Sequence, residues 1–298
     1  MRVFVTGASG FVGSAIVKEL LAAGHQVLGL VRSQKAAEQL KATGAEVCPG
    51  DVNDLELIKQ AATQCEAVIH TAFNHDFSRY AASCEDDRLV VEAFGEALAG
   101  TNKPLVITSG VGLLNYGRLV NEDDVLPAGS DVVPRAASEE AVAAVAAKGV
   151  NAYIVRLPPS VHGAGDHGFV PMVIEMARSK GQSAYVAEGN NRWPAVHCFD
   201  AAVLYRLIVE KQPELKVFHA VAEEGIPFRE IAEAISNGLQ LPTVSKTNEE
   251  AAKHFGWFLH FASIDCPSAS EKTRHALNWE PTATSLIEDI STAGYFNS

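Results

Sequence analysis

Short apolar runs rich in β-branched residues alternate with stretches of helical periodicity along the first 160 residues. The runs have the length of strands, and the stretches between them repeat apolar side chains every three or four positions. Strands are expected at 2–5, 26–31, 45–49, 66–70, 104–108 and 152–157, and helices at 12–21, 54–63, 78–100 and 134–148. This alternation predicts an α/β fold of the Rossmann type, a doubly wound parallel sheet with helices on both faces.

After residue 162 the segments follow one another less regularly. Helices are expected at 169–177, 200–208, 227–239 and 268–277, and strands at 184–186, 195–198 and 216–220. The expected division is a Rossmann domain over 1–162, completed by about 195–222, and a smaller C-terminal lobe formed by 163–194 and 223–298.

Glycines at positions 7, 10 and 13 form the turn between the first predicted strand and helix. Glycine allows a tight bend and lets backbone N–H groups approach a diphosphate, and a helix N-terminus favours negative charge. Because the turn lies in a β-α-β context, it predicts a dinucleotide site. The residues expected to bind the cofactor there are Gly7, Ser9, Gly10, Phe11 and Val12.

The second predicted strand ends in Arg32 and Ser33, and both are expected to bind the cofactor. An NAD-preferring site usually has an acidic residue here to bind the ribose hydroxyls, whereas an arginine accommodates a 2′-phosphate. The alternative is a solvated charge at a strand end. Because of its position relative to the glycine turn, Arg32 favours NADP(H) as the cofactor.

Composition narrows the class of protein. The 298 residues are 47% hydrophobic and 20% charged, as in globular proteins, and the net charge of −12 disfavours nucleic acids and anionic membranes as partners. Five scattered cysteines without a C-x-x-C pair indicate buried free thiols and no metal site. With no apparent signal peptide and no spanning apolar run, a cytoplasmic location and a small-molecule substrate are expected, and the oligomeric state stays open.

Further motifs follow the later predicted strands. The glycine turn, Gly50-Asp51-Val52, Ile69-His70-Thr71-Ala72, Ser109 and the 157–163 stretch together resemble the extended and atypical short-chain dehydrogenases/reductases. That family includes nucleotide-sugar epimerases, dihydroflavonol-type reductases and steroid dehydrogenases. The resemblance implies that the C-terminal lobe binds substrate. It also implies cofactor contacts from Asp51, Val52, Thr71, Ala72, Phe73, Pro158, Ser160 and Val161.

The structural alternatives at two of these positions are a helix cap for Asp51 and a turn residue for Ser160. Asp54 suits the cap role as well, because it precedes the predicted helix at 54–63.

The resembled family uses a Ser, with a Tyr and a Lys four residues apart, to protonate the alkoxide that follows hydride transfer. Ser109 is in place, but Arg135 stands at the Tyr position and Glu139 at the Lys position. A guanidinium has too high a pKa to donate a proton at neutral pH, although it can stabilise an oxyanion. Ser109, Arg135 and Glu139 are therefore the candidate catalytic residues.

The presence of Arg135 and Glu139 at the Tyr and Lys positions has two interpretations, and both remain open. In one, Arg135 and Glu139 form an (i, i+4) ion pair on a helix that has no part in carbonyl reduction. In the other, Arg135 and Ser109 stabilise negative charge while solvent, substrate or another acid supplies the proton. The candidate acids are Tyr116, His162, His167 and His197.

Three residues of the expected lobe have two interpretations each. Arg192 could contact an acidic substrate or be a surface charge. Trp193 and Trp257 could line an apolar pocket or belong to a core, and the core is favoured for both.

These features predict an NADPH-dependent oxidoreductase that reduces a small carbonyl or related electrophilic substrate. The alternatives are an epimerase or dehydratase with a retained cofactor, and a non-catalytic, NADP-binding redox sensor.

Overall fold

A computed structural model describes residues 1–296, and its centre is a seven-stranded sheet in which every pair of neighbouring strands is parallel. The strands, in spatial order, are β10 (Val217–His219), β6 (Ala152–Leu157), β5 (Leu105–Gly110), β4 (Ala67–His70), β1 (Arg2–Thr6), β2 (Gln26–Val31) and β3 (Glu46–Pro49). The strand order reverses beside β1, which has β2 on one side and β4 on the other. The predicted doubly wound Rossmann sheet is confirmed.

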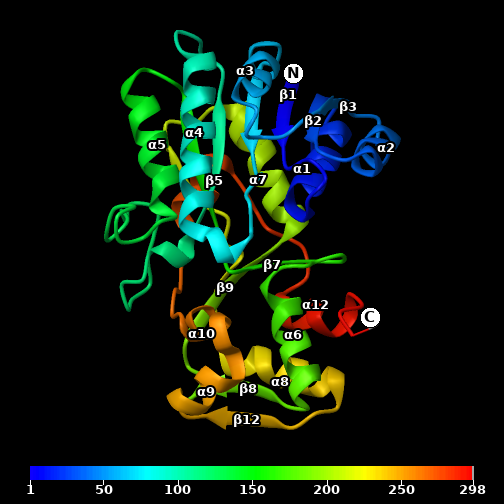
Figure 1. Cartoon of the computed structure of the whole chain (residues 1–298), viewed down its shortest axis with the longest axis vertical. Helices are drawn as coiled ribbons and strands as arrows, with labels where there is room; N and C mark the ends of the chain where they lie inside the picture. The colour runs from blue at the N-terminus through cyan, green and yellow to red at the C-terminus, as the bar shows by residue number, and fades with distance from the viewer. Residues whose placement is uncertain (297–298) are drawn as a thin grey trace.

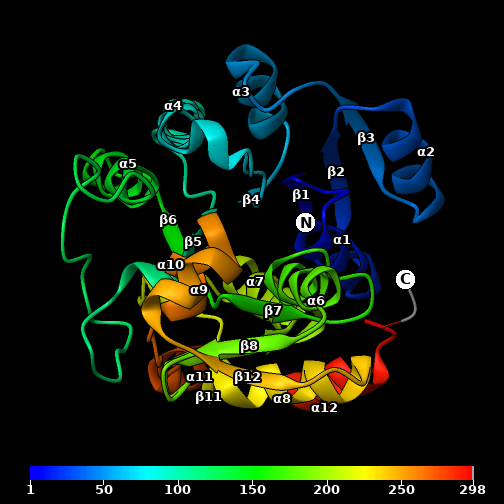
Figure 2. The same cartoon turned by 60° about the horizontal axis from the view of Figure 1, so that its bottom comes forward.

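Helices cover both faces of the main sheet (Figures 1 and 2). One face carries α1 (Phe11–Ala22), α2 (Gln34–Ala42) and α7 (Cys198–Lys211), and the other carries α3 (Leu55–Thr63), α4 (Tyr80–Leu98) and α5 (Ala136–Ala147). Fully buried aliphatic side chains such as Ile16 and Ile58 fill the two layers between helices and strands. Burying this surface on both sides explains why the strands are almost uniformly apolar.

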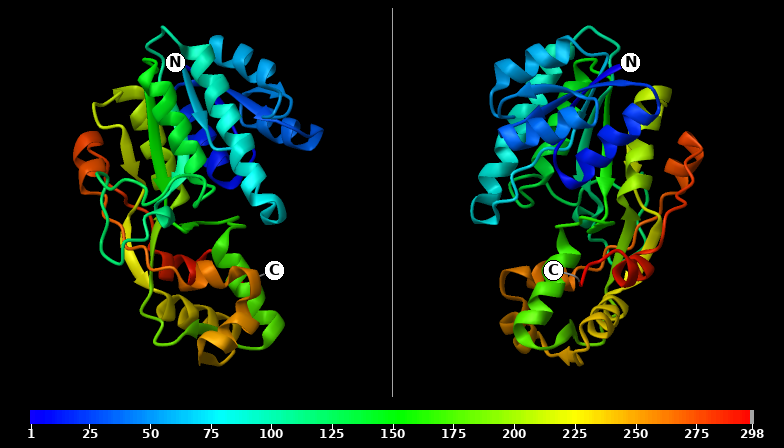
Figure 3. Two further views of the ribbon diagram at one scale, coloured as in Figure 1. Left: turned by 60° about the vertical axis from the view of Figure 1, so that its left-hand side comes forward. Right: turned by 90° about the vertical axis from the view of Figure 1, so that its right-hand side faces the viewer.

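Below the main sheet lies a smaller lobe (Figures 1 and 3). Its strands are β7 (Ser160–His162), β9 (Arg192–His197) and β11 (Glu223–Pro227) in one sheet, and β8 (Ser183–Val186) and β12 (Thr243–Lys246) in another. Its helices are α6 (Phe169–Lys180), α8 (Phe228–Leu239), α9 (Asn248–Phe255), α10 (Leu259–Ser263) and α12 (Leu286–Thr292). The fully buried Trp193 is part of the core of this lobe, as expected from the sequence.

The chain crosses between the two halves more than once. After β9 it returns to the main sheet through α7 and β10. It returns again late in the chain, where α11 (Glu271–Leu277) and Trp279 pack in the core beside α7. The Trp279 indole donates to the Asp200 backbone carbonyl over 3.0 Å. Residues 271–279 therefore pack with the main sheet although they fall within the 223–298 segment assigned to the lobe from sequence.

The short elements of the lobe were the hardest to predict. Five elements were not expected from the sequence, and each is only four to eight residues long in the structure: β11, β12, α9, α10 and α12. Local side chains still define some of their ends. Thr247 and Glu250 form a reciprocal capping box at the start of α9, and Ser285 caps α12.

All five cysteines are free and buried, as the sequence analysis expected. Among residues 1–296, no helix has the length and apolar character needed to cross a membrane.

His219 at the end of β10 makes folding stability depend on pH. Its Nδ1 lies 2.9 Å from the Ala269 carbonyl oxygen, and burial lowers the pKa of the imidazole below its ordinary value, despite the nearby carboxylate of Glu122. Between that lowered value and about 6.5, the unfolded chain binds a proton that the folded chain does not. The stabilising contribution is therefore complete above about pH 6.5 and is lost as the pH falls.

We expect His219→Asn to make the free energy of unfolding less dependent on pH below about 6.5. The slope should decrease by up to about 1.4 kcal/mol per pH unit, the value for one linked proton. Urea denaturation of both proteins at pH 7.5, 6.5 and 5.5 measures this slope. Parallel curves for the two proteins would show that His219 titrates alike in the folded and unfolded states.

Candidate active site

A cleft of about 940 Å³ opens where the carboxyl ends of the main-sheet strands face the lobe. Its inner side is formed by the β1–α1 turn and by the segments that follow β2, β3, β4, β5 and β6, and α6 and α10 close it from the lobe. Ligands of open parallel sheets bind at this edge, beside the point where the strand order reverses. The volume is at the upper end of the roughly 300–1,000 Å³ typical of small-molecule sites.

The glycine turn is packed too closely for other residues. Gly7 has a φ of +68°, and a Cβ there would lie 2.7 Å from Thr71 Oγ1. A Cβ on Gly13 would lie 2.0 Å from the Gly7 carbonyl oxygen. Helix α1 begins after Gly10, which has no side chain to cap the first N–H groups. These amides can therefore bind a diphosphate, so the turn fits a dinucleotide.

Most of the predicted cofactor residues come together along this cleft. Two do not: Ser33 caps α2 by accepting from the Ala36 amide over 3.2 Å, and Ser160 is buried within β7. Both lie outside the cleft lining, so the structure does not bring them together with the other predicted cofactor residues. The predicted residues that line the cleft are Gly7, Ser9, Gly10, Phe11, Val12, Arg32, Asp51, Val52, Thr71, Ala72, Phe73, Pro158 and Val161.

Arg32 lies at the end of the cleft formed by β2 and β3. Its side chain is 80% exposed, and its nearest carboxylate oxygen, on Asp51, is 3.8 Å away. The Asp51 carboxylate accepts instead from the Asn53 amide over 2.9 Å, while Asp54 caps α3 through the Leu57 amide. The helix-cap alternative for Asp51 is therefore wrong, and Arg32 is free to turn toward a ligand.

Ser109 and Glu139 belong to a buried ion-pair cluster. The Ser109 hydroxyl donates to Glu139 Oε1 over 2.6 Å, and Arg156 donates to both carboxylate oxygens, over 2.9 and 2.7 Å. The (i, i+4) pair between Arg135 and Glu139 is not formed, because each binds a different, buried partner. Ser109 lines the cleft, whereas Glu139 lies behind it.

Arg135 lies at the N-terminus of α5 and lines the cleft. Its NH1 donates to Asp87 Oδ2 over 2.9 Å and to the Ser138 hydroxyl, and its NH2 donates to the Thr108 carbonyl over 2.9 Å. The guanidinium also lies 4.3 Å from the centre of the Phe73 ring. These contacts hold the cation in one place at the end of the cleft next to Ser109.

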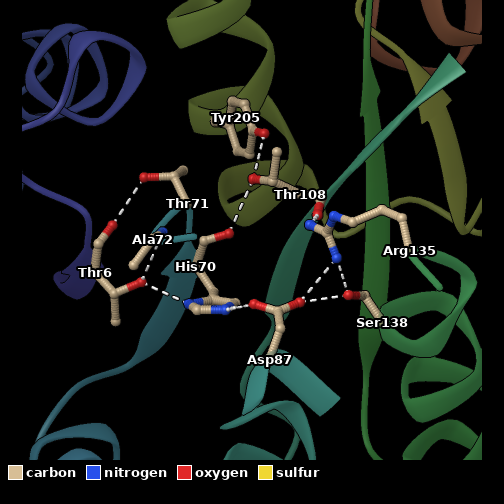
Figure 4. A network of polar contacts seen from close by, with 9 residues as sticks. All are labelled: Thr6, His70, Thr71, Ala72, Asp87, Thr108, Arg135, Ser138 and Tyr205. Atoms are coloured by element: carbon tan, nitrogen blue, oxygen red, sulfur yellow. Dashed lines mark hydrogen bonds and ion pairs between the residues drawn. The ribbon is translucent and has the colours of Figure 1, made fainter. Parts of the chain in front are cut away.

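Further polar contacts link the ion pair between Arg135 and Asp87 to the end of β1 (Figure 4). Asp87 Oδ1 lies 2.9 Å from His70 Nε2, and His70 Nδ1 lies 2.6 Å from the Thr6 hydroxyl. Thr6 immediately precedes the glycine turn and also accepts from the Ala72 amide over 3.4 Å. A chain of hydrogen bonds thus joins Arg135 at one end of the cleft to the dinucleotide turn.

Asp87 is ionised despite its burial. Burial raises the pKa of this carboxyl, but its contact with His70, the positive charge of Arg135 and the hydrogen bond from Ser138 outweigh that effect. The net result is a pKa well below the usual range. The charge on Asp87 therefore persists at neutral pH and fixes the position of Arg135.

No role was expected from the sequence for Asp87 or for the side chain of His70. A signal was present, because Asp87 occupies the inward face of α4, with the buried residues Ser83 and Val90 four residues before and three residues after it. A carboxylate on such a face needs a buried partner. The sequence does not identify that partner, since His70 and Arg135 reach it from other elements.

The four candidate proton donors are dispersed. Tyr116 is exposed and donates to a backbone carbonyl, and His162 is buried against Asp289, with a 2.8 Å contact. Burial lowers the pKa of His162. His197 lies beside His162, outside the cleft. Of the four, His167 alone lines the cleft.

For Arg192 the structure favours one of the two interpretations, and for Trp257 it corrects the expectation. Arg192 forms an ion pair with Asp265 over 3.1 Å and lies outside the cleft lining, so it is placed as a structural charge. The core interpretation of Trp257 is wrong, since the residue is 56% exposed. Its ring lies against Phe77 at the junction between the two halves, with ring centres 4.9 Å apart.

Comparison with known proteins agrees with this geometry. The NAD(P)H-binding family matches residues 7–170. An uncharacterized protein of Schizosaccharomyces pombe is 48% identical over 99% of this chain and 100% of the relative, and one of Saccharomyces cerevisiae is 44% identical over 97% and 98%. A 4-hydroxy-2-methyl-3-oxo-4-farnesyl-3,4-dihydroquinoline-1-oxide ketoreductase of Stigmatella aurantiaca is 32% identical over 60% of this chain and 56% of the relative.

Solved structures share the fold across its full length. The dTDP-glucose 4,6-dehydratase of Streptomyces venezuelae, solved with NAD bound, has a TM-score of 0.80 at 18% identity, covering 100% of this chain and 97% of that chain. The family match, the seven-stranded sheet and the glycine turn agree. The chain belongs to the NAD(P)H-binding family.

Proposed function

We propose that this protein is an NADPH-dependent oxidoreductase that reduces a small carbonyl compound. The observation that carries the proposal is the distribution of arginines in the cleft. Exposed Arg32 lies at one end, fixed Arg135 lies next to Ser109 at the other, and the glycine turn lies between them. The relationship to a ketoreductase supports a carbonyl as the reacting group.

Arg32 supports the choice of NADPH over NADH. No acidic residue occupies the end of β2, and the guanidinium is separated by 3.8 Å from the carboxylate of Asp51. A 2′-phosphate would give Arg32 a charge-assisted contact that a ribose hydroxyl cannot give. The bound cofactor would supply the hydride for the reaction.

Arg135 is proposed to stabilise the negative charge that develops on the substrate oxygen. Three N–H groups of Arg135 are used by Asp87, Ser138 and the Thr108 carbonyl, which leaves Nε–H and one NH2 hydrogen for a ligand. A donor that is already fixed stabilises a developing oxyanion without first having to reorganise.

Ser109 and Glu139 are proposed to position the substrate. Because Ser109 gives its hydrogen to Glu139, it presents oxygen lone pairs to the cleft, and Arg156 balances the charge of the carboxylate. The proton that completes the alcohol is proposed to come from solvent water. Tyr80, the tyrosine on the cleft wall, is a poor acid, since burial raises its pKa to about 12.

Arg32→Ala tests the choice of cofactor. We expect the Kd for NADPH to rise about tenfold or more, and the Kd for NADH to change less than about twofold, because only NADPH carries the 2′-phosphate. Fluorescence titration with each nucleotide measures the two constants. Arg229→Ala, which removes an exposed arginine of the lobe, is the control and should change neither value. An unchanged preference in Arg32→Ala would refute the proposed phosphate contact.

Arg135→Ala tests the role of the fixed cation. We expect kcat/KM to fall more than tenfold while the Kd for NADPH stays within about twofold. The substitution also leaves buried Asp87 without its cation, so the free energy of unfolding should fall by about 3 kcal/mol. Steady-state kinetics with a carbonyl panel and urea denaturation measure these effects.

The double variant Arg135→Ala/Asp87→Asn separates catalysis from stability. Asp87→Asn removes the buried negative charge that Arg135→Ala leaves without a cation. It should therefore restore part of the stability without restoring turnover. Recovery of turnover in the double variant would make Arg135 a purely structural residue.

A further inference from the structure

A row of aromatic rings lines the cleft from the main-sheet side to the lobe. We call Phe73, Tyr80, Phe77, Phe261 and Phe169 the aromatic wall, because all five line the cleft and each contacts the next. The distances between successive ring centres are 6.3, 5.9, 5.9 and 4.6 Å. These separations are in the range of favourable edge and offset contacts between rings.

The aromatic wall begins at the proposed reaction centre. Phe73 lies directly under the Arg135 guanidinium, which is 4.3 Å from its ring centre. A flat molecule lying along the wall would therefore have one end beside the cation that binds the reacting oxygen. The other end would lie toward Phe261, in the lobe.

The charges of the cleft disfavour a phosphorylated substrate. Among the described residues that line it, Arg32 and Arg135 are the only lysine or arginine side chains. Arg32 is at the far end, and Arg135 is already neutralised by a carboxylate. Asp86 and Asp166 add negative charge to the lining. A nucleotide diphosphate in the substrate position would meet these carboxylates without a free cation to balance it.

We infer that the substrate is a neutral aromatic carbonyl compound whose ring system lies against the aromatic wall, with its carbonyl oxygen at Arg135. The inference rests on the proposed reductase function and specifies its substrate class. Stacking against Phe77 and Tyr80 supplies binding energy away from the reacting atoms, and the bond to Arg135 fixes the carbonyl.

The fluorescence of Trp257 can be used to detect ligand binding at the aromatic wall. Its ring contacts Phe77, while the two other tryptophans, Trp193 and Trp279, are fully buried. Trp193 contacts Phe169 from the core of the lobe. Trp257 is thus the exposed tryptophan of the chain and the one whose ring contacts Phe77. A ligand that displaces or covers Phe77 should change its fluorescence, and Trp257→Phe should abolish that change.

Calorimetric titration of the full-length protein, with and without saturating NADP⁺, tests the inference directly. The probes are 2-acetonaphthone, its aliphatic counterpart cyclohexyl methyl ketone, and UDP-glucose. We expect the aromatic ketone to bind about tenfold or more tightly than the aliphatic one, and UDP-glucose to bind no more tightly than the aliphatic ketone.

Phe77→Ala should weaken binding of 2-acetonaphthone about tenfold, whereas the matched control Phe199→Ala should leave it unchanged. Phe199 is an exposed phenylalanine, whereas Phe77 is half-buried, and Phe199 lies on α7, outside the cleft lining. If Phe77→Ala does not fold by circular dichroism, Phe77→Leu keeps the apolar volume and removes only the ring. The fluorescence response of Trp257 should be lost in parallel.

Equal affinity for the two ketones, tighter binding of UDP-glucose, or no binding of 2-acetonaphthone would overturn the inference. Its failure is distinguishable from failure of the reductase proposal. Turnover of NADPH with aliphatic carbonyls alone would keep the reductase and remove the aromatic substrate. Binding of 2-acetonaphthone that depends on Phe77, without NADPH oxidation by any carbonyl, would keep the aromatic ligand and remove the reductase.

Discussion

The close packing of α1 against the end of β1 is the constraint on which the site depends. Gly13 and the Gly7 carbonyl are so near each other that a single added carbon on Gly13 would overlap that oxygen. This contact brings the first turn of α1 to the sheet edge, with its amides directed into the cleft. The neighbouring residues Thr6 and Thr71 then join the turn to β4, so the cofactor end of the cleft is built from adjacent strands.

The charged residues at the substrate end of the cleft differ from the Tyr and Lys of the resembled family. The cation is Arg135, held by Asp87, and the Lys position carries Glu139, held by Arg156. Each buried charge has an oppositely charged partner and further hydrogen bonds, which is the condition under which ionised groups persist away from water. The result is a rigid, charged end of the cleft that can orient an oxygen atom but holds no tyrosine with a lowered pKa.

The lobe completes the site through aromatic contacts. Phe77, just before α4, meets Trp257 and Phe261 from the opposite half, so the substrate end of the cleft is bounded by rings from both parts of the chain. The late return of α11 and Trp279 to the main-sheet core ties the lobe back to α7. Substrate position and lobe position are therefore coupled through a few large side chains.

The sequence alone determined the main sheet, the dinucleotide turn and the absence of the Tyr and Lys pair. These features depend on local rules, namely the periodicity of buried strands and helices, the backbone freedom of Gly7 and the residue types at positions 135 and 139. The partners of Asp87 and Glu139, the exposed position of Trp257 and the wall formed around Phe77 were decided only by the tertiary structure. Each joins residues from separate elements, and side-chain packing in three dimensions, which no spacing along the chain records, selects which of them meet.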